Sequence, residues 1–151
     1  MSPSEGPLQL REQDYLPLAD CAFQHWGERE GEPFSHLRPL TPDAAERAWR
    51  RTSAMAARQW AEAAEGLDVL DLRTLDDWSP DSVRDWLLSQ LADREQPILV
   101  CYQPRVAVHL PWGVACEHWL QFFWTSGCAF PLSEEWVMVH DGDRFAVGRR
   151  E

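Results

Sequence analysis

Cysteine and histidine are the residues of this sequence whose spacing could support metal binding or nucleophilic chemistry. Cys21 and His25 are four residues apart, so a helix would place them on one face, whereas Cys116 and His118 would share a face only on a strand. Together they could form a Cys₂His₂ zinc site. The spacing between the two pairs matches no zinc finger or ribbon, so we favour reduced, buried thiols and packed or hydrogen-bonded histidines, and we expect no cofactor.

Short motifs of known catalytic mechanism are absent from the chain. It contains no GxSxG, no Walker-type glycine loop, no GxGxxG, no HExxH and no HxE followed by PCxxC. The run CEH at 116–118 sets a thiol near a histidine, but the base that activates a thiol normally comes from elsewhere in the fold. We therefore predict no catalytic residue and keep a small metal-binding or thiol enzyme as the alternative.

Negative charge is the most uneven property of the sequence. The net charge is −11, and residues 62–95 alone carry ten acids and three arginines, a net charge of −7. Residues 41–61, by contrast, carry two acids and four arginines, a net charge of +2. An acidic surface repels nucleic acid and attracts cationic partners, so we expect a protein partner with a basic surface and no nucleic acid.

Tryptophan supplies a second sign of a binding surface. Of the nine tryptophans, Trp49, Trp60 and Trp86 fall on predicted helix stripes and are expected in the core. Trp78, Trp112 and Trp124 fall at element ends and are better candidates for exposed contacts, since tryptophan is enriched in interface hot spots. A solvated acidic face is the alternative interpretation of the acids around Trp78. The predicted partner-binding residues are Asp68, Asp71, Asp76, Asp77, Trp78, Asp81 and Asp85.

Two helices are expected to position these residues. The first begins at Thr41, a good N-cap, and ends at Gly66. Its apolar positions recur at helical spacing: Ala45, Trp49, Thr52, Ala56, Trp60 and Ala63. The second begins after Ser79 and buries Val83, Trp86, Leu87 and Leu91. A third, short helix is expected at 113–124.

Strands follow in the second part of the chain. Apolar or alternating runs predict strands at 98–102 and 105–110, and the Asp-Gly pair at 141–142 predicts a hairpin between 136–140 and 144–148. Residues 67–72 could be a short strand or an extended connector, and residues 8–18 could supply an edge strand.

These elements predict one α+β domain at 8–151, preceded by a flexible N-terminus at 1–7. We expect helices in the N-terminal two-thirds to pack on a mainly antiparallel sheet of about four strands, formed mostly by residues 98–149. No apolar run approaches the ~18 residues that span a bilayer, and no secretory signal is visible, so we expect no membrane association and a cytoplasmic location.

The C-terminal third resembles a pattern found in small uncharacterised bacterial proteins. The matching residues are Trp112, His118-Trp119, Phe122 to Trp124, Glu135-Trp136 and Phe145 to Arg149. More broadly, the chain is similar to small acidic α+β immunity proteins that neutralise bacterial toxins. The resemblance implies a non-enzymatic inhibitor of a basic toxin. An accessory or structural subunit of a bacterial assembly is a further alternative.

Overall fold

The computed structural model describes residues 8–61, 68–141 and 143–149, without the side chains of 53–61 and 149. The flexible N-terminus predicted at 1–7, the helix stop at Gly66 and the glycine of the 141–143 turn therefore lie outside the described residues, as do the side chains of Ala56 and Trp60. The structure is α+β.

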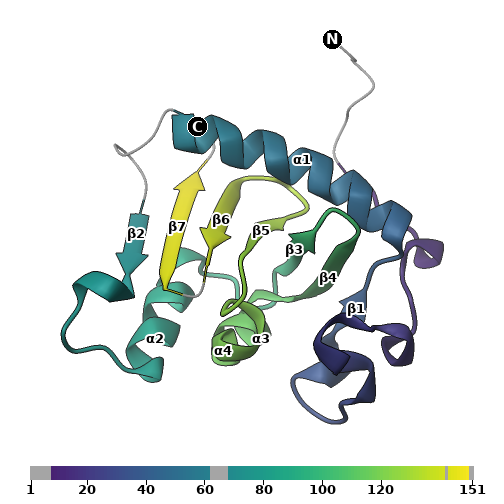
Figure 1. Ribbon diagram of the computed structural model, residues 1–151, viewed down its shortest axis with the longest axis horizontal. Coiled ribbons are helices and arrows are strands. Elements are labelled where there is room, and N and C mark those ends of the chain that lie inside the picture. The colour runs from purple at the N-terminus through teal and green to yellow at the C-terminus, as the bar shows by residue number, and fades with distance from the viewer. Residues whose placement is uncertain (1–7, 62–67, 142, 150–151) are drawn as a thin grey trace.

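One antiparallel sheet of seven strands, in the order β1-β4-β3-β5-β6-β7-β2, forms the centre of the described fold (Figure 1). The strands are β1 (Arg38–Pro39), β2 (Asp68–Asp71), β3 (Pro97–Gln103), β4 (Val106–Pro111), β5 (Gly127–Pro131), β6 (Trp136–His140) and β7 (Arg144–Arg149). The α-helices are α1 (Pro42–Ala61), α2 (Pro80–Gln90), α3 (Trp112–Glu117) and α4 (Trp119–Phe122). Short 3-10 turns cover Glu12–Asp14, Leu18–Asp20, Phe23–Glu28, Phe34–His36 and Leu72–Thr74.

The predicted sheet of about four strands is wrong, because β1, β2 and β5 add to β3, β4, β6 and β7. β5 has the sequence GCAFP, whose glycine and proline are typical of a turn, and β1 is an Arg-Pro pair with no strand preference of its own. Both pair through tertiary context: β5 lies between β3 and β6, and β1 lies beside β4. The helix expected at 113–124 is found as α3 and α4 at 112–122, so helices are not confined to the first two-thirds of the chain.

Helix α1 covers one face of the sheet and crosses β4, β3, β5 and β6 (Figure 1). Its buried side consists of small side chains: Ala44, Ala45 and Ala48 pack on Leu99 and Phe130 of the strands beneath. Arg51 holds the helix to the turn before β6 by a bidentate ion pair with Glu134. The distance from Arg51 Nε to Glu134 Oε1 is 2.9 Å. Glu134 is only 8% exposed and has a positive φ of 58°, so the ion pair holds a strained residue in place.

Helices α2, α3 and α4 lie on the opposite face, over an aromatic core. Fully buried Trp26, Trp112, Phe122 and Phe145 belong to it, and several of the residues that carry the C-terminal resemblance are among its members. The backbone turns at His118 (φ −119°, ψ 38°), so α3 and α4 are separate and the side chains after the turn face a new direction. None of the described helices is long and apolar enough to cross a membrane.

Candidate functional site

The acidic residues predicted to bind a partner follow one path, from an edge strand of the sheet to the start of α2. Asp68 and Asp71 bound β2, at the edge of the sheet next to β7. Asp76, Asp77 and Trp78 follow in the loop that leads to α2. The remaining two, Asp81 and Asp85, lie in the first turns of α2, whose N-cap Ser79 accepts a hydrogen bond from the backbone N–H of Ser82 at 3.1 Å.

Three of these six carboxylates pair with arginines within the chain. Arg73 donates two side-chain hydrogen bonds of 2.9 Å to Asp71 and thereby lowers the pKa of that carboxyl group. Arg84 pairs with both Asp81 and Asp85. The other three, Asp68, Asp76 and Asp77, are exposed and form no ion pair with any side chain that the structure describes. The free negative charge is therefore smaller and more localised than the −7 of the sequence indicates.

Next to the acids, two exposed tryptophans pack on the ring of Trp119, which is itself buried. Trp78 packs edge-on against Trp119, with ring centroids 6.3 Å apart, and Trp124 packs on the same ring at 6.2 Å. The exposed fractions of Trp78 and Trp124 are 38% and 49%, and that of the neighbouring Leu120 is 51%. We call Trp78, Leu120 and Trp124 the tryptophan surface.

Sequence reasoning identified only part of this surface. Trp78 and Trp124 are exposed as expected, but Trp112, the third candidate, is fully buried and packs on Trp136. Leu120 was missed because it follows Trp119 in an apolar run that indicates only a buried helix. No signal in the sequence shows that the chain turns at His118 and exposes it.

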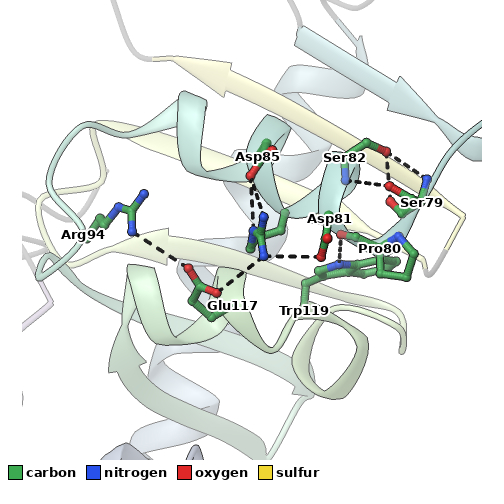
Figure 2. Close-up of polar contacts among 9 residues, drawn as sticks. Ser79, Pro80, Asp81, Ser82, Asp85, Arg94, Glu117 and Trp119 are labelled. Carbon is green, nitrogen blue, oxygen red and sulfur yellow. Dashed lines mark hydrogen bonds and ion pairs between the residues drawn. The ribbon is translucent and has the colours of Figure 1, made fainter.

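A groove opens between the N-terminal turns of α2 and the α3–α4 segment. Its volume is about 340 Å³. The hydrogen bond from Trp119 Nε1 to the carbonyl oxygen of Pro80, 3.0 Å long, joins the two walls (Figure 2). The lining residues are Pro80, Asp81, Arg84, Glu117, His118, Trp119, Leu120 and Gln121.

Charged side chains on the two walls are linked by Arg84. Its guanidinium donates to Asp85 Oδ1 at 3.1 and 3.2 Å, and more weakly to Asp81 Oδ1 at 3.3 Å. The carboxylate of Glu117 on α3 lies 4.0 Å from Arg84 and 3.8 Å from Arg94 (Figure 2). Thus Arg84 is held mainly by Asp85, and Asp81 and Glu117 are only loosely engaged.

The Cys₂His₂ arrangement does not form. Cys21 and Cys116 are buried, and burial raises the pKa of both thiols. His25 instead extends into solvent beside Glu28, with 82% of its side chain exposed. Among the described residues no three His, Cys, Asp or Glu side chains come together where they could hold a metal, and no described Ser, Thr or Cys side chain hydrogen-bonds to a histidine ring.

The α1 arginines whose side chains the structure describes do not form a basic surface. Arg47 pairs with Asp14 and Arg50 with Glu46, and Arg51 is committed to Glu134. The described part of the positive stretch at 41–61 is thus largely neutralised within the chain.

Comparisons with known proteins give no relative: no family model, no curated protein and no solved structure matches this chain. A function for this chain must therefore be inferred from the chemistry of the exposed acids, the tryptophan surface and the groove.

Proposed function

We propose that this chain is a non-enzymatic binding module that recognises a basic protein partner through the acidic residues at 68–85 and the tryptophan surface. In its most specific form, the proposal is an immunity-type inhibitor that covers the active cleft of a basic toxin. We further propose a cytoplasmic location, since four free cysteines suit a reducing compartment.

The observation that carries the proposal is the exposure of Trp78 and Trp124 on one apolar surface, next to unpaired carboxylates. Large aromatic side chains that remain exposed in a group lose the hydrophobic stabilisation that burial would give, at about 25 cal/mol per Å². Clustered exposed apolar residues with a polar border are typical of protein-binding sites. Tryptophan also dominates interface hot spots, where truncation costs about 2 kcal/mol or more.

The exposed acids specify the charge of the partner. Asp76 and Asp77 directly precede Trp78 and have no counter-ion among the described residues, so their field extends into solvent. Such a field accelerates association with a positively charged surface and disfavours a negatively charged one. A partner with arginine or lysine around an apolar contact meets both requirements.

The direct test is affinity capture from an extract of the source organism with the wild-type chain and two variants. Asp76→Arg/Asp77→Arg reverses the free charge, and Trp78→Ala removes the aromatic contact. Asp20→Arg/Glu30→Arg is the matched control, because it makes the same charge change at exposed acids in the N-terminal part of the chain. A true partner is retained by the wild type and the control and lost from both test variants.

The captured protein is then purified and its binding measured at several salt concentrations. We expect Trp78→Ala to weaken binding by about thirtyfold, from the ~2 kcal/mol of a hot-spot truncation. A partner that binds both test variants as tightly as the wild type would exclude this surface. Recovery of a stable multi-subunit assembly that does not depend on Trp78 would support the accessory-subunit alternative instead.

A further inference from the structure

The groove between α2 and α3–α4 combines two features that suit a cationic side chain. Its walls each carry a loosely engaged carboxylate, Asp81 on α2 and Glu117 on α3, with 81% and 45% of these side chains exposed. Its remaining lining includes the aliphatic side chain of Leu120, 51% exposed, and Pro80. We infer that this groove receives an arginine side chain of the partner, with the guanidinium beside Arg84, at Asp81 Oδ2 and the Glu117 carboxylate, and the aliphatic stem along Leu120.

The size of the groove agrees with this occupant. Sites for small ligands have volumes of roughly 300–1,000 Å³, and one liquid water takes about 30 Å³. The groove, at about 340 Å³, therefore has room for one long side chain and a few waters, but not for a folded element.

The contacts of Arg84 show that a guanidinium fits the groove and that more binding capacity remains. Arg84 approaches from α2, donates two hydrogen bonds to Asp85, and reaches Asp81 and Glu117 only at 3.3 and 4.0 Å. No hydrogen bond or ion pair engages Asp81 Oδ2 from any residue in the described ranges. A second guanidinium has five donors in a planar fork and can bridge both carboxylates, which a lysine ammonium does less well.

We call the part of the groove that Asp81 and Glu117 border the arginine slot. It is next to the tryptophan surface. Trp119 and Leu120 line the groove, and the rings of Trp78 and Trp124 both pack on the ring of Trp119. A partner segment that contacts the tryptophans with an apolar residue would thus place a neighbouring arginine at the slot. This inference rests on the proposed function and adds the identity of one partner residue to it.

A small probe tests the slot without the partner. Nα-acetyl-arginine methylamide is titrated into the ¹⁵N-labelled full chain at low salt, and the indole N–H signal of Trp119 reports occupancy because that group lies on the groove wall. Two partly exposed carboxylate contacts predict a dissociation constant on the order of 10 mM. The citrulline analogue has the same shape without the charge and should cause no saturable shift.

Variants identify the residues responsible. Asp81→Asn/Glu117→Gln should weaken binding of the arginine probe by about fivefold or more. Asp20→Asn/Glu30→Gln, which removes two exposed charges that do not line the groove, should leave it unchanged. The folded chain is checked in each case by the dispersion of its indole signals.

Three results would overturn the slot: no saturable shift with the arginine probe, an equal shift with the citrulline analogue, or equal affinity in the Asp81/Glu117 variant. Equal affinity for the lysine analogue would overturn the preference for a guanidinium. These failures are separate from failure of the proposed function, since partner capture that still depends on Asp76, Asp77 and Trp78 would stand without an arginine in the groove.

Discussion

Replacement of His140 by leucine should remove a large part of the sensitivity of the fold to acid. The ring of His140 is 1% exposed and lies between Phe123 and Tyr102, with ring centroids 5.0 and 6.3 Å away. Burial lowers its pKa from the usual 6.5 to about 4, although backbone groups of Thr125 and Phe123 lie near enough to favour the proton. Neither ring nitrogen has a hydrogen-bond partner, and burial favours the neutral ring in the folded protein.

The expected magnitude follows from the two pKa values. As the pH falls below about 6.5 the unfolded chain takes up a proton at His140, whereas the folded protein does so only near pH 4. The unfolded state therefore binds more protons in this interval and stability falls with pH. The loss from His140 is about 2 kcal/mol at pH 5 and about 3 kcal/mol at pH 4, relative to pH 7.5.

The assay is urea unfolding of wild type and His140→Leu between pH 7.5 and 4, followed by tryptophan fluorescence. Leucine is apolar and close to histidine in volume, so it removes the titrating group with little change in the space filled beside Gly127. The difference in unfolding free energy between the two proteins should shift by about 3 kcal/mol in favour of the variant over this range. Other groups, including His109 with a pKa of about 4, titrate in both proteins and cancel in the difference.

His36→Leu controls for the loss of one histidine, because its ring lies at the surface beside Glu32. It should keep the acid-dependent loss that His140 causes. If the difference between wild type and His140→Leu changes by less than about 1 kcal/mol between pH 7.5 and 4, the assignment of a neutral, buried His140 is wrong. Should the leucine variant fail to fold, His140→Gln provides the same comparison.

Four further predictions concern other parts of the fold. Glu134→Gln leaves the Arg51 guanidinium, 23% exposed, without its charge partner; because the site is mostly buried, urea unfolding should show a loss of about 2–3 kcal/mol. Ser79→Ala removes the N-cap of α2 and should cost about 1 kcal/mol, while Ser79→Asp should retain most of it, which thermal unfolding can compare. Gly127→Ala would place a methyl group 2.8 Å from the His140 ring, so unfolding measurements should show a loss of about 1–3 kcal/mol. All four cysteines are buried, so a thiol reagent should modify none of them in the native chain and all of them in denaturant.

The two long helices were predictable from local chemistry. Thr41 and Pro42 mark the start of α1, and Ser79 and Pro80 mark the start of α2, because caps and N-terminal prolines act within one turn of the helix. The hairpin of β6 and β7 was equally local, since β-branched runs flank its turn.

Apolar and alternating runs also predicted β3 and β4, whereas the pairing of β1, β2 and β5 depends on contacts that sequence patterns do not encode. β2 pairs with β7 across more than seventy residues of chain, and β5 inserts between β3 and β6. β2 is only four residues long, although a short strand was one of the two expectations for 67–72, and β5 has a glycine at its start and a proline at its end. Their place in the sheet comes from burial on the two faces and from the partner strands.

The candidate site likewise combines features that the sequence shows with features that depend on the folded chain. The position of the acids was visible in the sequence. The sequence also indicates that some of them pair locally, because Arg73 and Arg84 lie within three residues of Asp71 and Asp81. The exposure of Trp124 was expected from its place at an element end, whereas that of Leu120 was not, and the backbone turn at His118 is seen only in the folded chain.

The division of the surface into free acids and exposed aromatics separates two contributions to binding. Exposed charges act mainly on encounter, so Asp76→Asn/Asp77→Asn should lower the association rate about tenfold at low salt and reduce its salt dependence, with little change in dissociation. The tryptophan surface acts after contact, so Trp78→Ala and Trp124→Ala should accelerate dissociation about thirtyfold and leave association nearly unchanged. Binding kinetics with the captured partner would measure both. If Trp78→Ala slowed association and left dissociation unchanged, the aromatic ring would serve the encounter, and the apolar contact would have to lie elsewhere.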